Sequence, residues 1–193
     1  MSAARPGPSG AAVVRSASRL RGEPRLPGDK SISHRALLLA AAARGESRIL
    51  ASGDGADVRS TAAIVRRLGV RVERVRDDGR TVDYVVSSPG ADALAEPDAI
   101  LDCGNSGTSL RLAAGLIASL PMYAVLDGDA SLRRRPVARI IDPLRLMGAA
   151  LSARRNDSLP PLTVVGHTPL RAIDVTTPVP SAQVKSAILL AGL

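Results

Sequence analysis

Residues 30–42 read KSISHRALLLAAA, a polar segment that leads directly into an unbroken run of leucine and alanine. A helix that is apolar on every face is typical of the inside of a protein. The polar residues at its start fit the first turn, where backbone N–H groups have no partner within the helix. We therefore expect a buried helix over 31–43 whose N-terminus opens onto a surface.

The same pattern occurs three times, at a spacing of 75 residues. Ser31 lies at the start of the first copy, Ser106 of the second (GNSGTSLRLAAGLIASL, 104–120) and Ser181 of the third (SAQVKSAILLAGL, 181–193). A fixed period of this length indicates a repeated supersecondary unit. If rotation relates the units, the three N-termini open on one surface.

Each unit is expected to contain a helix, a strand, a second helix and two strands. The second helix differs from the first, because over 58–68 its apolar residues lie on one side, as in a surface helix. The sequence predicts an α/β (α+β) fold with buried parallel helices inside and strands and amphipathic helices around them. The expected elements are helices over 31–43, 57–68, 107–119 and 136–147, the last with Pro136 in its first turn, and strands over 47–52, 70–75, 81–87, 123–127, 149–154, 162–166 and 172–177.

The composition argues against several classes of function. Tyr84 and Tyr123 are the only aromatic residues, so base stacking on aromatic side chains is not expected. The net charge of +8 is uneven, with +5 in residues 1–35 and only +3 in the rest, so no nucleic-acid partner is expected. With Cys103 as the single cysteine and two distant histidines, neither a disulfide nor a metal site is expected. No apolar run reaches the ~20 residues of a membrane span, so no membrane partner and a cytoplasmic location are expected.

The two ends of the chain suggest a leader and a truncated domain. Residues 1–22 are rich in Ala, Arg, Ser and Gly and contain no acid, so 1–24 are predicted to be a disordered leader, with a transit peptide as the alternative. The sequence stops at Leu193 inside an apolar helix. We expect 25–193 to be a truncated domain with about two and a half of three repeats.

The rare lysines lie in the repeated motif. The chain has 24 arginines but only two lysines, Lys30 and Lys185. Ser31 and Arg35 are four residues apart and share a helix face, as do Ser181 and Lys185. Helix N-termini attract anions through free N–H groups and the helix dipole, so the three starts with their cations predict an anion site. The alternative is that these residues only cap and cover ordinary helix ends.

Four motifs, in order, resemble those of 5-enolpyruvylshikimate-3-phosphate synthases. They are LPGDKSISHRA (26–36), GNSGTSLR (104–111), RRP (134–136) and SAQVKSA (181–187). The resemblance implies transfer of the enolpyruvyl group of phosphoenolpyruvate to the 5-hydroxyl of shikimate 3-phosphate, with release of phosphate and no cofactor. It implies an enzyme, monomeric at full length, with two domains that are each an inside-out α/β barrel of three repeats. This chain would then be most of the N-terminal domain, and without the other domain its turnover is expected to be negligible.

The resemblance also implies roles for individual residues. Lys30 would contact both substrates and act in catalysis, and Gln183 would reach both ligands. Shikimate 3-phosphate would be bound by Ser31, Arg35 and Ser181. Phosphoenolpyruvate would be bound by Gly107 and Arg135, with Arg135 as a bidentate clamp. Supporting positions would be Asn105, Thr108, Ala182 and Lys185. The chain departs from some members of the family at Leu112, Ala182 and Lys185.

Two other functions remain open at this point. The related transferase that acts on UDP-N-acetylglucosamine usually carries a reactive cysteine in the loop that corresponds to GDASLRRR (128–135), which here has none. A non-catalytic anion-binding or nucleic-acid-binding module is suggested by the basic composition.

Four further positions carry expectations of their own. A structural role is expected for His34, a small buried thiol for Cys103, and a carboxylate partner for Arg111. The acids Asp127 and Asp129 are expected to shape a turn.

Overall fold

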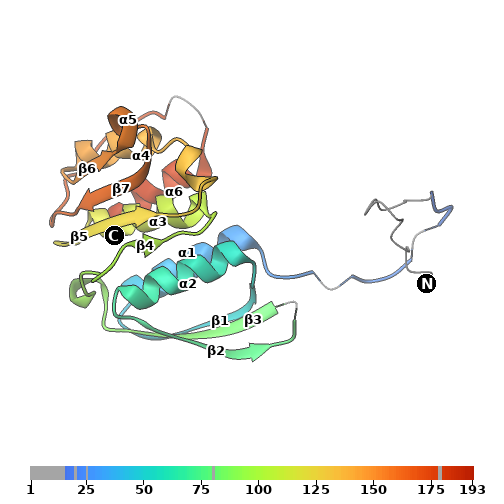
Figure 1. Ribbon diagram of the computed structural model, residues 1–193. Helices are drawn as coiled ribbons and strands as arrows, with labels where there is room; N and C mark the ends of the chain where they lie inside the picture. Colours follow the sequence, from blue (N-terminus) through green and yellow to red (C-terminus); the bar gives the residue numbers. More distant parts are fainter. Residues whose placement is uncertain (1–15, 20, 25, 80, 178–179) are drawn as a thin grey trace.

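The computed structural model describes residues 16–19, 21–24, 26–79, 81–177 and 180–193. Two lobes, each a sheet covered by helices, share one hydrophobic core (Figure 1). The helices are α1 (Lys30–Ala42), α2 (Ala56–Arg67), α3 (Gly107–Ala118), α4 (Ala138–Met147), the single turn α5 (Arg154–Asp157) and α6 (Ala182–Ala191), with 3₁₀ turns η1 (Ala91–Ala93) and η2 (Leu132–Arg134). The strands are β1 (Gly45–Gly53), β2 (Arg71–Asp77), β3 (Thr81–Ser88), β4 (Leu101–Asp102), β5 (Tyr123–Asp127), β6 (Ala150–Ala153) and β7 (Leu159–Val165).

The two sheets repeat the same topology. The first has the order β1-β3-β2 and is antiparallel throughout. The second has the order β4-β5-β7-β6, so β5, β7 and β6 reproduce the arrangement of β1, β3 and β2. The predicted repeat of helix, strand, helix and two strands is therefore confirmed for the first two units. The extra strand, β4, pairs parallel to β5 and has only two residues, which is too short to leave a pattern in the sequence.

The first helices of the units run parallel, with α3 packed closely against α6. An ideal Cβ built on Gly115 of α3 would lie only 2.3 Å from the carbonyl oxygen of Ala187 of α6. Near the helix starts, Gln183 Nε2 donates to Thr108 Oγ1 at 2.9 Å. The contact nearer the start of α3 (Thr108) is made by Gln183, near the start of α6, and the contact further along α3 (Gly115) is made by Ala187, further along α6. The two helices therefore run in the same direction.

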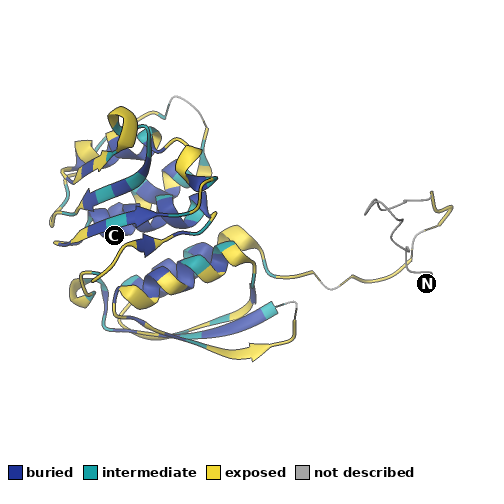
Figure 2. Cartoon of the chain, viewed as in Figure 1, coloured by how far each residue is buried: buried dark blue, intermediate teal, exposed yellow. Residues whose placement is uncertain are grey.

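The expectation that all three inner helices are buried on every face is met by α3 only. Ten of its twelve residues are buried, whereas Leu39 of α1 and Leu189 of α6 are 47% and 71% exposed (Figure 2). The reason is positional: α1 and α6 pack beside α3, and each keeps an outward face that no described residue covers.

One predicted strand and one predicted helix boundary are wrong. Residues 172–177 form no strand, since none of them joins a sheet ladder among the described residues. The second amphipathic helix begins at Ala138 rather than at Pro136. The backbone N–H of Val137 donates to Ser158 O at 2.9 Å, and Pro136 O accepts from Arg111 Nη2 at 2.8 Å, so this segment is tied to its neighbours before the helix begins.

The predicted leader lies largely outside the described residues. Its described parts, 16–19 and 21–24, are exposed and contain no helix or strand. In the part of the chain that the structure covers, no helix has both the length and the apolar character needed to cross a bilayer.

Candidate functional site

The N-termini of α1, α3 and α6 meet at one end of the molecule. Besides the Thr108–Gln183 contact, Arg35 of α1 donates through Nε and Nη2 to Ser186 Oγ of α6, at 3.0 and 2.6 Å. Lys30 of α1 reaches α2, whose first turn accepts a hydrogen bond from Ser109 of α3. The predicted site residues thus come from the starts of three helices that contact one another, α1, α3 and α6, and from the adjoining loops with Asn105 and Arg135.

Side-chain caps fix all three helix starts. Ser106 accepts from Ser109 N at 3.0 Å, and Ser181 accepts from Val184 N at 3.4 Å. In α1 the cap is Asp29, which accepts from Ile32 N at 2.8 Å, so Ser31 is already inside the helix with an exposed side chain. Its carbonyl accepts from Arg35 Nη1 at 2.9 Å. Capping therefore leaves the hydroxyl of Ser31 available to a ligand.

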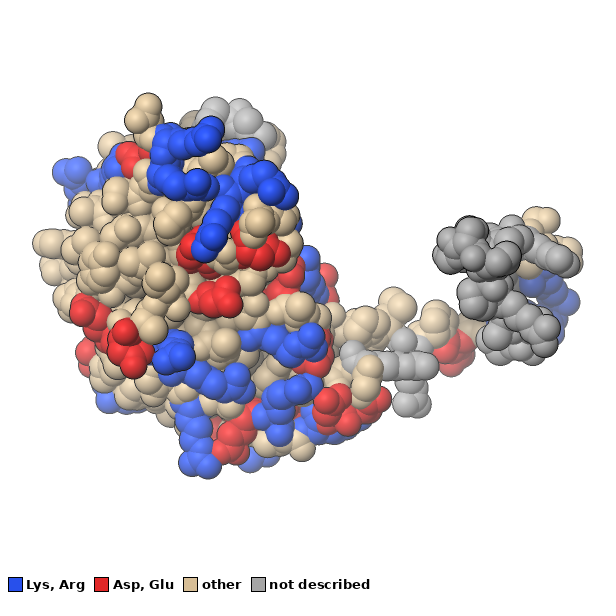
Figure 3. Space-filling model, viewed as in Figure 1, with Lys and Arg blue, Asp and Glu red and all other residues tan. Residues whose placement is uncertain are grey.

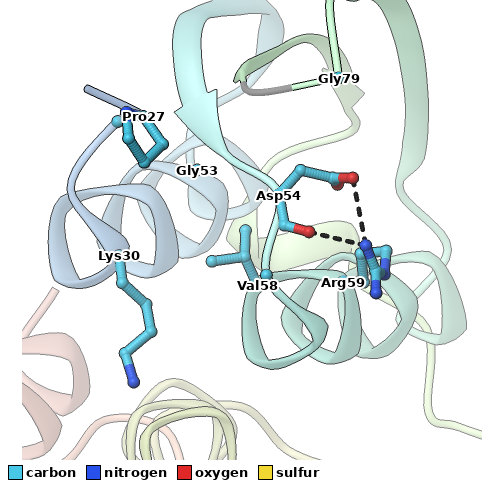
Figure 4. Close-up of a pocket in the computed structure, with 9 residues that line it drawn as sticks. Pro27, Lys30, Gly53, Asp54, Val58, Arg59 and Gly79 are labelled. Atoms are coloured by element: carbon cyan, nitrogen blue, oxygen red, sulfur yellow. Dashed lines mark hydrogen bonds and ion pairs between the residues drawn. The ribbon is translucent and has the colours of Figure 1, made fainter. Parts of the chain in front are cut away.

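Lys30 stands beside an open cavity of about 670 Å³ (Figure 4). Gly28 brings the preceding segment against β1, because a Cβ there would lie 2.0 Å from Ala51 O. The Lys30 side chain, 59% exposed, points away from the Asp54–Arg59 pair that the cavity also contains. Its ammonium lies 3.0 Å from Asp57 Oδ2.

Two guanidinium groups lie over the bare Cα of Gly107. An ideal Cβ at this position would be 2.5 Å from Arg111 Nη1 and 3.6 Å from Arg135 Nη1. Arg111 Nη1 donates to Gln183 Oε1 at 2.8 Å and to Gly107 O at 3.1 Å, so its expected carboxylate partner is replaced by amide and carbonyl oxygens. Burial lowers the pKa of Arg111, and the neighbouring charges of Arg139 and Arg135 lower it further. This is a cluster of like charges that favours an anion.

A short loop holds Arg135 in place. Its Nη2 donates to Asn105 Oδ1, and Asn105 Nδ2 donates to Asp129 Oδ2 at 2.8 Å. Asp129 also accepts from Leu132 N at 2.8 Å, and these hydrogen bonds hold its pKa below the usual range. Asp127 instead pairs with Arg133 at 2.6 Å, so both acids shape the turn, as expected.

The remaining candidate residues are more peripheral. Ala182 and Lys185 are exposed in the first turns of α6. Within the described ranges, the side chain of Lys185 forms no hydrogen bond or ion pair, and Arg35, Arg111, Arg135 and Arg139 form no ion pair with a carboxylate. On the face shown in Figure 3, Lys and Arg side chains lie interspersed with Asp and Glu side chains. The site can therefore bind anions through several cations that have no internal counter-charge.

A buried polar chain joins the starts of the helices. His34 Nδ1 lies 2.6 Å from Thr61 Oγ1, which lies 2.7 Å from Ser109 Oγ, and Ser109 Oγ lies 2.8 Å from the Ser106 cap. His34 is fully buried and its Nε2 has no partner among the described residues. Burial therefore lowers the pKa of His34 to about 4, and nearby Lys30 and Arg35 act in the same direction. The expected structural role of His34 agrees with this geometry.

This shift predicts a loss of stability in mild acid. The pKa of His34 falls from 6.5 to about 4 on folding, so between these values the unfolded chain binds the proton more readily. Stability is fully present above pH 6.5 and is lost as the pH falls toward 4. Urea unfolding should show that the free energy of unfolding is about 2 kcal/mol lower at about pH 5 than at about pH 7. His34→Gln cannot titrate and should flatten this dependence; an equal slope in both proteins would contradict the assignment.

Sequence reasoning missed two residues of the site. Arg111 was assigned to a carboxylate because it interrupts an apolar helix, although its place four residues after Gly107 puts it on the same face. Asp57 gave no signal, because an acid in the first turn of a helix is ordinary. Cys103 is buried as expected, and burial raises the pKa of its thiol, so it is no nucleophile at neutral pH. No group of three or more His, Cys, Asp or Glu in the described ranges could hold a metal ion.

Residues 14–193 match a family model described as EPSP synthase (3-phosphoshikimate 1-carboxyvinyltransferase). A 3-phosphoshikimate 1-carboxyvinyltransferase of Anaeromyxobacter sp. (strain K) is 55% identical over 185 residues, which make up 96% of this chain and 40% of that protein. One of Xylella fastidiosa is 50% identical over 181 residues, 94% of this chain and 39% of that protein. The chain thus spans about 40% of the length of these curated relatives.

Solved structures show the same likeness. An EPSP synthase from Acinetobacter baumannii superposes with a TM-score of 0.82 at 40% identity, covering 89% of this chain and 38% of that one. The two sheets described above are both open, which agrees with an incomplete barrel.

Proposed function

Since the chain belongs to the EPSP synthase family, we propose that it supplies one half of a site that transfers the enolpyruvyl group of phosphoenolpyruvate to the 5-hydroxyl of shikimate 3-phosphate. The proposal includes residues 25–193 as part of an N-terminal domain. The observation that carries it is the pair of guanidiniums over Gly107, without a carboxylate partner, at the start of the most buried helix.

The chemistry of phosphoenolpyruvate fits this cluster. The molecule carries a carboxylate and a phosphate, and planar guanidinium groups bind both bidentately. Gly107 lets the Arg111 guanidinium lie directly over the backbone, because a Cβ there would be only 2.5 Å from Arg111 Nη1. We assign phosphoenolpyruvate to Gly107, Arg135 and Gln183, with Asn105 and Thr108 holding the last two in place.

Shikimate 3-phosphate is assigned to the neighbouring ends of α1 and α6. Ser31 offers an exposed hydroxyl, Arg35 spans the two helices, and Ser181 and Gln183 lie at the start of α6. Lys30 is placed between the two ligands, where its ammonium can stabilise the negative charge that develops during addition. Ala182 and Lys185 take outer positions, and an Ala182 side chain cannot donate a hydrogen bond to the phosphate.

Calorimetry tests the proposal on the chain itself. Shikimate 3-phosphate should bind. UDP-N-acetylglucosamine and a mixed-sequence oligonucleotide should bind at least about tenfold more weakly, because they would be held only by surface charges that salt screens and not by this cluster. A preference for the UDP-sugar or the oligonucleotide would overturn the assignment.

Turnover by this chain alone should be negligible, because the chain spans only about 40% of the length of its curated relatives and so supplies only part of the site. The measurement is phosphate release from phosphoenolpyruvate with shikimate 3-phosphate present. Release above the rate without protein would show that this half of the site is sufficient.

A further inference from the structure

The geometry points to Asp57 as a positioning residue that holds the Lys30 ammonium toward the substrates, an inference that rests on the proposed function. Lys30 Nζ donates to Asp57 Oδ2 at 3.0 Å across 27 residues of sequence. The carboxylate is the less exposed partner, at 30% against 59% for the lysine side chain. The acid is therefore the fixed member of the pair and the lysine the movable one.

Two helices fix the place of Asp57. It lies in the first turn of α2, where the helix dipole favours a negative charge and where Gly55 provides no side-chain cap. Its carbonyl oxygen accepts from Ser109 Oγ of α3 at 3.1 Å. Because Ser109 also belongs to the buried hydroxyl chain from His34, the backbone of Asp57 is tied to the same framework that holds the start of α3.

A second acid, Asp54, lies just before α2 and has different partners. Asp54, three residues earlier, pairs with Arg74 at 2.8 Å and Arg59 at 3.1 Å, and accepts from Tyr84 at 3.3 Å. It does not pair with Lys30, which points the other way in Figure 4. Among the described residues, Asp57 is the carboxylate that pairs with Lys30.

This arrangement has opposite effects on binding and on orientation. A carboxylate beside the ammonium directs it, but it also repels an incoming phosphate. Removing the charge should therefore tighten anion binding while the lysine loses its fixed direction. A residue with a merely structural role would loosen the site and weaken binding instead.

The small number of lysines permits a direct experiment. Reductive methylation with ¹³C-formaldehyde keeps the charge and labels Lys30 and Lys185, plus the terminal amine, so the NMR spectrum has few signals. The signal that disappears in Lys185→Arg belongs to Lys185, and this identifies the signal of Lys30. Asp57→Asn should shift the Lys30 signal and leave that of Lys185 in place. Inorganic phosphate and shikimate 3-phosphate, titrated separately, should each bind about fivefold more tightly.

Matched variants complete the design. Asp54→Asn removes one negative charge three residues away, just before α2, and should leave the ligand-free Lys30 signal unchanged. Asp57→Glu keeps the charge and should hold phosphate affinity within about twofold of the wild type, which also guards against a folding defect in Asp57→Asn. An unmoved Lys30 signal in Asp57→Asn, or weaker phosphate binding, would overturn the positioning role. If phosphate behaves as expected but shikimate 3-phosphate does not bind the wild type, the proposed function fails and the positioning role stands.

Discussion

Replacing Gly115 by alanine should lower the free energy of unfolding by about 3 kcal/mol. The new Cβ would lie 2.3 Å from Ala187 O, 2.7 Å from Ala187 Cα and 2.8 Å from Ala187 C. All three atoms belong to backbone, so no side chain can rotate away and α6 must move off α3. This cost exceeds the roughly 1 kcal/mol that alanine gains over glycine inside a helix.

Urea unfolding followed by circular dichroism measures this effect. Gly55→Ala is the matched control, because a Cβ there meets nothing within 4 Å, and it should cost less than about 1 kcal/mol. A Gly115→Ala protein as stable as the wild type would mean that α3 and α6 do not pack this closely. The start of α6, with Ser181 and Gln183, would then lose its place in the site.

Replacing Arg135 by alanine should weaken phosphoenolpyruvate binding about 30-fold. The estimate follows from the loss of a charged hydrogen-bond donor, worth about 2 kcal/mol, in a site whose other cations remain. Arg111 cannot compensate, because Gln183, Gly107 O and Pro136 O already hold its guanidinium.

The control for this measurement is the preceding residue. Arg134 is exposed at the end of η2, and its side chain has no hydrogen bond or ion pair with the residues that the structure describes. Calorimetry should give Arg134→Ala an affinity within about twofold of the wild type. Equal losses in both variants would indicate a diffuse electrostatic effect rather than a clamp at Arg135.

The repeat made most of the fold predictable. Three apolar helices at one spacing, each with a polar start, identified α1, α3 and α6, and turn residues placed the strands between them. What the pattern could not give is which faces of these helices are covered. Leu39 and Leu189 look like core residues in sequence, but whether they are buried depends on what packs against them in space.

The site was predictable where residue type and position coincide. Lys30, Gly107, Arg135 and Gln183 lie in short motifs, and the structure brings them to one end of the helices. Arg111 and Asp57 were missed because their partners, Gln183 and Lys30, are 72 and 27 residues away in sequence. Long-range pairs of this kind leave no local signal. The predicted start of α4 at Pro136 was wrong for the same reason, because the Pro136 carbonyl accepts a hydrogen bond from Arg111, which is distant in sequence.

We propose that the amino ends of α1, α3 and α6 form one anion-binding surface. Backbone amide shifts on titration with shikimate 3-phosphate test it most directly. The expected result is that amides of 30–33, 107–109 and 182–184 move together along one saturating curve, while those at the opposite ends of the same helices stay in place. Shifts confined to one helix start, or spread over the opposite ends, would contradict it.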